Sequence, residues 1–247
     1  MAKIMNNYPK FSILLTGAID IKYTPFAKSV PKNIRLNEYI KSISYMLKKY
    51  ENLNFVYIDS SNYDLKLRNP EFSKFSNFES LSFSAQDIVK RKGKGAGELL
   101  SIDYALKNSI LLRDSNYIMK LNGKYKLLNL EKIIRKIDFE DKNSIIFGEF
   151  RAYNSWFDSR CFLAKKEIFK ELTTYEIDDF KGRFFENVLA SLVNFHLSKN
   201  ISKWRMFQSK PKFIGTSGHS GNNLKSNLVK SLIIDCFYFL KYKIISI

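Results

Sequence analysis

Short apolar runs and longer amphipathic segments alternate along most of this chain. Mostly apolar runs at Phe11–Thr16, Leu53–Ile58, Tyr117–Leu121, Ser144–Phe147 and Cys161–Ala164 predict strands. Apolar residues spaced three and four apart predict helices over Arg35–Tyr50, Leu130–Ile137, Lys166–Leu172 and Phe184–Leu197, and another that begins near Glu98. This alternation predicts an α/β fold with a mostly parallel, doubly wound central sheet flanked by helices.

The segment that precedes the helix near Glu98 is rich in glycine and lysine. Its sequence is KGKGAG, and its candidate ligands are Lys92, Lys94, Gly95 and Gly97. Glycines let backbone N–H groups converge on an anion, and the helix points its positive dipole end at the same place. The segment therefore predicts a basic loop for a phosphorylated ligand, although it lacks the P-loop pattern.

A second basic turn follows the strand Tyr117–Leu121. The turn reads Asn122-Gly123-Lys124 and places Lys120 and Lys124 around the carboxyl end of the strand. In open α/β sheets, ligands bind at that edge. Two basic glycine turns, one βα step apart, favour a phosphate site, and the alternative is that both are solvated turns.

Composition limits the class of partner. The chain has 247 residues, 45% of them hydrophobic and 15% aromatic, which supports a sizeable core and excludes wholesale disorder. The net charge of +17 and pI of about 9.7 indicate acidic partners: nucleic acid, anionic lipid or phosphate-bearing substrates. Lysines are spread along the whole chain, so part of this charge serves solubility.

Cysteine and histidine are too few for a zinc site, a disulfide framework or a multi-histidine metal centre. Cys161 and Cys236 are far apart, and His196 and His219 are the only histidines. No signal-peptide pattern and no apolar run of about 20 residues is present. We therefore expect a cytoplasmic protein.

The last residues form a distinct segment. We expect one domain over residues 1–222 and a basic amphipathic helix over 223–247. Apolar residues recur there at helical spacing: Leu228, Leu232, Ile233, Phe237, Leu240 and Ile244. Four lysines accompany them, so the helix is suited either to docking on the inner face of the cytoplasmic membrane or to packing on the domain.

Several motifs together resemble a family of bacterial glycosyltransferases from capsule and lipopolysaccharide gene clusters. In order they are FSILLTGAID, FVYIDSSNYD, KGKGAGE, YIMKLNGKY, DSRCFLAKKEIF and FFENVLA, and they cover roughly Phe11 to Val193. The family usually has a KGxGE loop and a K-[IL]-T-G-R turn. This chain has KGAGE and KLNGK, with Asn122 for Thr and Lys124 for Arg. The resemblance implies the GT-A fold, in which a Rossmann-like half that binds the nucleotide-sugar is fused to a half that binds the acceptor.

The resemblance also implies residues that bind the donor. Asp59, at the end of the second strand, corresponds to an acid that hydrogen-bonds the base or ribose, and Thr16 and Gly17 end the neighbouring strand. The alternative for Asp59 is a turn or cap residue.

Most GT-A enzymes hold a divalent cation with an Asp-X-Asp motif, but that position reads Lys120-Leu121-Asn122 here. Divalent cations prefer anionic oxygen ligands, and lysines can neutralise a diphosphate themselves. We therefore expect no metal and no other cofactor. The alternative is that the lysines only decorate a turn.

For catalysis, Glu186 in FFENVLA corresponds to the general base of GT-A enzymes at the start of a late helix. Asp158 is the rival, and Asp178 and Asp179 are further candidates. The alternative for Glu186 is charge complementation of the helix dipole. Neither His196 nor His219 is expected to be catalytic.

The resemblance therefore implies a hexosyltransferase-type enzyme that uses a nucleotide-sugar donor and a saccharide or lipid-linked oligosaccharide acceptor of a surface polysaccharide. The main alternative is a basic nucleic-acid-binding protein without catalytic activity, although no RNP-like motif or known binding module is recognisable. A non-catalytic membrane scaffold rests on the tail alone.

Overall fold

A seven-stranded sheet forms the centre of the protein. The computed structural model describes residues 10–22, 30–151, 154–176, 184–199, 203–216 and 223–224. The strands lie in the order β10-β6-β9-β4-β1-β2-β3. Their bounds are β1 Phe11–Gly17, β2 Asn54–Asp59, β3 Phe78–Ser82, β4 Tyr117–Asn122, β6 Ser144–Phe147, β9 Cys161–Lys165 and β10 Lys203–Arg205. Of these strands, β9 alone runs against the others, so the predicted mostly parallel sheet is confirmed.

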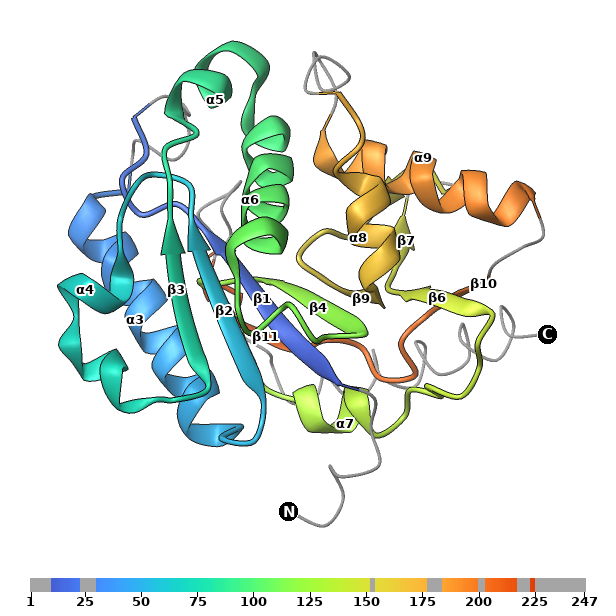
Figure 1. Cartoon of the computed structure of the whole chain (residues 1–247), viewed down its shortest axis with the longest axis horizontal. Helices are drawn as coiled ribbons and strands as arrows, with labels where there is room; N and C mark the ends of the chain where they lie inside the picture. Colours follow the sequence, from blue (N-terminus) through green and yellow to red (C-terminus); the bar gives the residue numbers. More distant parts are fainter. Residues whose placement is uncertain are drawn as a thin grey trace.

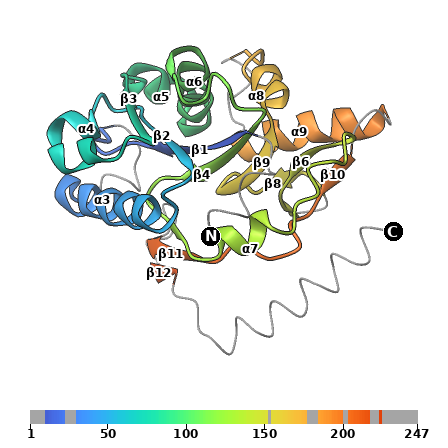
Figure 2. The same ribbon diagram turned by 60° about the horizontal axis from the view of Figure 1, so that its bottom comes forward.

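Helices cover both faces of this sheet (Figures 1 and 2). One face carries α3 (Lys32–Lys49), α4 (Leu65–Arg68), the 3₁₀ helix η1 (Pro70–Lys74) and α7 (Leu130–Ile134). The other carries α5 (Gln86–Lys92), α6 (Lys94–Asn108), α8 (Lys166–Leu172) and α9 (Phe185–Ser198). Within the described ranges, no helix is both long and apolar enough to cross a membrane.

Two smaller sheets accompany the central one. Strands β5 (Lys126–Leu127), β11 (Phe213–Thr216) and β12 (Asn223–Leu224) form an antiparallel sheet, and β7 (Phe150–Arg151) pairs with β8 (Trp156–Phe157). Asn223 and Leu224, the first two residues of the predicted tail, pair with β11.

The core divides into two clusters because side chains alternate along each strand. On β1, Ile13 and Leu15 pack with the α3 face, whereas Leu14 packs with the α6 face. The same alternation on β4 places Ile118 on the α6 face, between Met119 and Tyr117 on the other. Lys120 follows Ile118 by two residues, so it also lies on the α6 face.

The strand register brings the candidate residues to one edge of the sheet. Thr16 on β1 lies opposite Asn122 on β4, and Gly17 lies opposite Asp59 on β2. Beyond the strands, Gly123 N donates to Thr16 O at 2.8 Å, and Asn122 N donates to Arg160 O at 3.2 Å. The carboxyl ends of β1 and β4 therefore meet the start of the antiparallel strand β9.

Some sequence predictions fall outside the described residues. These are His219, Cys236, Asp178, Asp179 and the tail from Lys225 to Ile247. The structure also contains β3, β10 and β11, which the hydrophobic pattern did not indicate.

Gly148, between β6 and β7, is a point of close packing in the α6-face core. A Cβ at this position would lie 2.5 Å from Phe157 Cε1 and 3.2 Å from Phe162 Cβ. The Phe157 ring is fully buried and packs edge-on against Phe150, with ring centroids 4.9 Å apart. A larger residue at 148 must therefore displace an aromatic side chain.

We predict that Gly148→Ala lowers the free energy of unfolding by about 1–3 kcal/mol, as expected for overpacking a core. The measurement is equilibrium denaturation in urea. Phe157→Leu makes room at the same point, so the double variant should lose less than the sum of the single variants. Strict additivity would show that the clash is relieved elsewhere.

Candidate functional site

The predicted basic loop over 92–97 is wrong as a loop. Helix α5 extends to Lys92, and α6 begins at Lys94, so Gly93 alone separates the two helices. Gly93 has a φ of +89°, a conformation that side chains rarely adopt, which explains a glycine here. Because of the change of direction at Gly93, the start of α6 faces the edge of the sheet where an extended loop was predicted.

The two later glycines lie inside α6 and differ in role. The first amides of a helix have no acceptor within it, and in α6 these belong to Lys94, Gly95 and Ala96. Gly97 is buried, and a Cβ there would lie 2.5 Å from Val89 Cγ2 of α5. Gly97 therefore serves the packing of α5 on α6, whereas Lys94 and Gly95 remain suited to an anion.

Lys124 lies in the predicted turn after β4, where its backbone N donates to Asn122 Oδ1 at 3.3 Å. Burial of its ammonium, and then the positive charge of Lys94, lower the pKa of Lys124 to about 8. Arg35 on α3 lowers this pKa further, whereas Glu38 opposes the shift. Lys94 and Lys124 thus bring two like charges together, from the start of α6 and from the end of β4.

Lys120 does not share that position. Its side chain is only 2% exposed; the ammonium forms an ion pair with Glu98 and donates to Ser159 O at 2.7 Å. In this arrangement the Lys120 charge is compensated inside the protein. Because the Lys120 side chain is buried, it has no open surface through which it could contact a diphosphate as predicted. Lys94, in contrast, is exposed.

Glu98 is the carboxylate that holds this cluster together. It lies one helical turn after Lys94 on α6, pairs with Lys120 and accepts a hydrogen bond from Thr16 Oγ1 at 2.7 Å. Burial opposes its ionisation, but Lys120, Lys94 and Thr16 outweigh burial and lower the pKa of Glu98. Glu98 is therefore an anion that links α6 to β1 and β4.

Glu186 lies in the first turn of α9, at the start of a late helix as predicted. Ser159 Oγ donates to its Oε1 at 2.7 Å. The other oxygen, Oε2, has no hydrogen-bond partner in the part of the chain that the structure describes. Glu186 is thus a partly exposed carboxylate that is held through one oxygen and has the second available.

Asp158, the rival carboxylate, is engaged in a different way. It accepts from Arg160 Nη2 at 2.6 Å and from Arg151 Nη2 at 2.7 Å. Burial alone would raise its pKa, but the bonds and charges of the two arginines lower it. A carboxylate stabilised by two guanidinium groups is a weak base, so the geometry favours Glu186 over Asp158 as proton acceptor.

Asp59 is fully buried at the end of β2. Its oxygens accept from Ile19 N at 3.0 Å, Tyr57 Oη at 2.8 Å and Ser61 N at 2.7 Å. Burial is the largest influence and raises its pKa despite these bonds. Asp59 therefore orders the loops after β1 and β2, the turn role that was its alternative, and a direct bond to a base or ribose would require these donors to move.

Gly17 provides space beside those loops. A Cβ at Gly17 would lie 2.6 Å from Tyr39 Cε1 and 2.6 Å from Tyr57 Oη. Tyr39 Oη in turn accepts from Ala18 N at 3.1 Å. The chain after β1 therefore packs directly on two tyrosine rings, which fixes the edge of the sheet beside Thr16.

Two residues of the site were not selected from the sequence. Glu98 is the last residue of the KGAGE motif, and Ser159 belongs to the DSRCF motif, so both lie in motifs that carried the resemblance. Their role depends on contacts between distant elements, for which a single sequence holds no signal.

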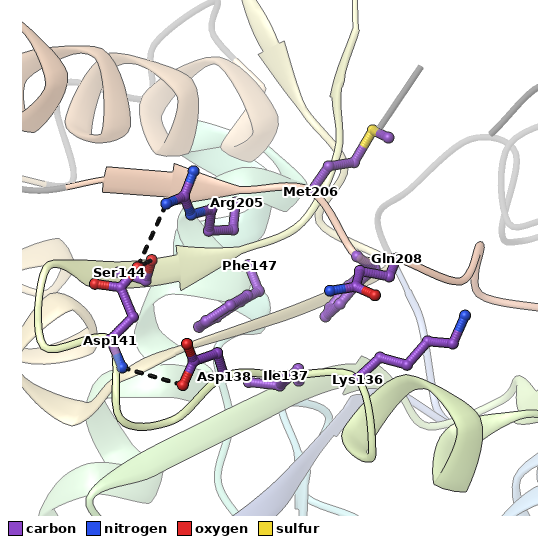
Figure 3. Close-up of a pocket in the computed structure, with 10 residues that line it drawn as sticks. Lys136, Ile137, Asp138, Asp141, Ser144, Phe147, Arg205, Met206 and Gln208 are labelled. Atoms are coloured by element: carbon purple, nitrogen blue, oxygen red, sulfur yellow. Dashed lines mark hydrogen bonds and ion pairs between the residues drawn. The ribbon is translucent and has the colours of Figure 1, made fainter. Parts of the chain in front are cut away.

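Outside this cluster, the structure has a pocket of about 240 Å³ on the α7 side of the sheet (Figure 3). Its wall includes Asp141, which accepts from Ser144 Oγ at 2.6 Å and lies 3.5 Å from Arg205. The predicted site residues do not line this pocket. Among the described residues, no group of three or more His, Cys, Asp or Glu side chains is arranged to hold a metal ion.

Comparison with known proteins identifies the fold. No family model matches the chain, and no curated protein sequence is significantly similar to it. The inositol-1-phosphate CTP transferase from T. maritima is similar with a TM-score of 0.53 and 11% identity, over 92% of this chain and 96% of that one. The mannosyltransferase Ktr4p from S. cerevisiae is similar with a TM-score of 0.50 and 9% identity, over 87% and 72%. The chain therefore has the Rossmann-like fold of GT-A glycosyltransferases and nucleotidyltransferases.

Proposed function

We propose that this protein is a glycosyltransferase that moves a sugar from a nucleotide-sugar donor to a saccharide acceptor. The observation that carries the proposal is the pair of cations formed by Lys94, at the start of α6, and Lys124, in the turn after β4. Glu186 lies at the same edge, linked to β4 through Ser159 and Lys120. A leaving diphosphate needs positive charge, and an attacking hydroxyl needs a base, and this edge supplies both.

In this proposal, protein side chains supply the positive charge that neutralises the diphosphate of the donor. Lys94 and Lys124 bind the diphosphate, with the amide of Gly95 at the start of α6 and the side chain of Asn122 beside them. Lys92, in the last turn of α5, adds long-range charge. Two like charges repel until an anion lies between them, so the pair favours a ligand that carries at least two negative charges.

Glu186 is the proposed general base. Its Oε2 accepts the proton of the acceptor hydroxyl as that oxygen attacks the anomeric carbon, and the bond to the diphosphate breaks. Base removal of this proton fits an inverting displacement, in which acceptor and leaving group lie on opposite faces of the sugar. The acceptor that fits the family resemblance is a capsule or lipopolysaccharide saccharide, including one linked to lipid at the membrane surface.

The first test concerns the charge of Lys124. An anion stabilises the ammonium, so binding of a nucleoside diphosphate should take up protons near pH 8 and weaken as pH rises above about 8. Affinity should fall by up to about tenfold per pH unit, because one proton is linked to binding. Titration calorimetry of UDP, CDP, GDP and ADP, in buffers with different ionisation heats, measures both effects.

Lys124→Met should remove the proton uptake and weaken binding, whereas Lys126→Met, two residues away on β5, should not. The parent nucleosides should bind without this pH dependence. Binding that is independent of pH between 7.5 and 9.5 would remove Lys124 from the diphosphate site. Binding of mixed-sequence DNA with a steep salt dependence, and of no diphosphate, would favour the nucleic-acid alternative.

The second test concerns the base. Glu186→Gln keeps the size of the side chain and its bond to Ser159 but cannot accept a proton, so kcat should fall by about 10²–10⁴-fold. The Kd of the nucleoside diphosphate should stay within about twofold. Turnover close to that of the wild type would assign the base to another carboxylate, and Asp158→Asn would be the next variant to measure.

The third test concerns metal. If lysines carry the charge on the leaving group, transfer should continue at the same rate in excess EDTA. A known Mn²⁺-dependent glycosyltransferase in the same assay shows that the chelator is effective. Loss of transfer in EDTA and recovery with Mg²⁺ or Mn²⁺ would contradict this account of Lys94 and Lys124.

A further inference from the structure

Lys120 is a lysine on the buried face of a central strand, and its position has no evident benefit for packing. Its neighbours in that core, Ile118 and Phe162, are fully buried and apolar. Moving an ammonium out of water is costly, and replacing a buried ion pair with apolar residues is often neutral or stabilising. Stability alone therefore does not explain why a charged side chain occupies this position.

The partners of Lys120 lead in two directions. On one side Glu98 pairs with it and also accepts from Thr16 Oγ1, which ties Lys120 to the second turn of α6 and to the end of β1. On the other side the ammonium donates to Ser159 O at 2.7 Å. One buried charge thus fixes the backbone of the segment that enters β9.

Ser159 passes this constraint to Glu186. Its carbonyl oxygen is held by Lys120, and its hydroxyl donates to Glu186 Oε1 at 2.7 Å. Ser159 is itself only 8% exposed, so its side chain has little freedom to turn away. The Phe185 ring, next to Glu186 on α9, also lies 5.9 Å from the Lys120 ammonium.

We propose that Glu98, Lys120 and Ser159 form a positioning relay that holds Glu186 Oε2 toward the acceptor hydroxyl. The relay rests on the proposed function, because Glu186 is the base of that reaction. It runs from α6, one turn beyond the amides and the lysine that bind the diphosphate, to the first turn of α9. One chain of contacts across the sheet therefore fixes the position of the base relative to the diphosphate site.

The relay predicts a specific kinetic pattern. Ser159→Ala removes the bond to Glu186 and keeps the carbonyl bond to Lys120, so kcat should fall by about 10- to 100-fold, the loss typical of a misplaced catalytic group. The Kd of the nucleoside diphosphate should remain within about twofold. Ser159→Thr keeps a hydroxyl and should recover part of the lost turnover, which a purely structural role would not predict. Ser198→Ala, an exposed position on α9, is the matched control.

Removing the buried pair tests the earlier step of the relay. Lys120→Met or Glu98→Gln alone leaves one partner without its counterpart and can unfold the protein, so the double variant is the informative one. With Glu98→Gln and Lys120→Met together, the fold should be kept, as circular dichroism can confirm, and kcat should fall as in Ser159→Ala. Adding Ser159→Ala to the double variant should lower kcat little further, because the three residues act in one chain.

A crystallographic comparison separates this inference from the proposed function. Glu186 should occupy one side-chain position in the wild type and a different or mixed position in Ser159→Ala, whether or not a donor has been found. An unchanged Glu186 in Ser159→Ala would overturn the relay. A wild-type kcat in that variant would also overturn the relay. So would a loss of affinity for the nucleoside diphosphate as large as the loss of kcat. Absence of sugar transfer by the wild type with every nucleotide-sugar would instead contradict the proposed function.

Discussion

The buried ion pair of Lys120 and Glu98 constrains the rest of the site. A lysine in the core of a sheet requires a carboxylate beside it, since an unpaired buried charge costs several kcal/mol, about 3–5 when one partner of a pair is removed. Glu98 can contact both Lys120 on β4 and Thr16 on β1 only when α6 has one particular position along these strands. The pair therefore sets the position of α6 along the sheet, and with it the position of Lys94 at the start of the helix.

The positive charges of the site divide into two kinds. Lys120 and Arg160 are compensated by carboxylates within the fold, and they hold segments in place. Lys94 is exposed and Lys124 is half-buried, and the charge of Lys94 helps to lower the pKa of Lys124. The first kind stabilises geometry at the start of β9, and the second is suited to an anion from solution. Sequence alone does not separate the kinds, because Lys120 and Lys124 belong to the same KLNGK motif.

How well each element could be predicted from the sequence depends on what stabilises that element. Strands β1, β4 and β6 are buried on both faces, so their apolar runs predicted them within a residue or two. Strand β3 (FESLS) lies at the edge of the sheet, and most of it is only partly buried, so its polar residues gave no strand pattern. The KGKGAG segment has the composition of a loop, but α6 begins within it at Lys94, and its glycine at 97 packs closely on Val89 of α5. The place of Glu186 in the first turn of a late helix was predicted correctly because helix starts can be recognised locally, whereas the contacts of Glu98 and Ser159 arise only in the tertiary structure.

The pair of Lys94 and Lys124 gives the proposed reaction a property that a metal site lacks. A divalent cation carries a fixed charge, but the proton occupancy of Lys124 depends on what lies beside it, since its pKa of about 8 is set by burial and by Lys94. When the bond to the sugar breaks, the diphosphate gains negative charge, and that charge favours the protonated lysine more strongly than the intact donor does. The interaction is thus stronger late in the reaction than at its start, which is the condition under which binding energy accelerates chemistry. Burial of Lys124 makes this difference larger, because water screens its charge less. The same burial that lowers the pKa of Lys124 therefore makes its charge effective when the leaving group forms.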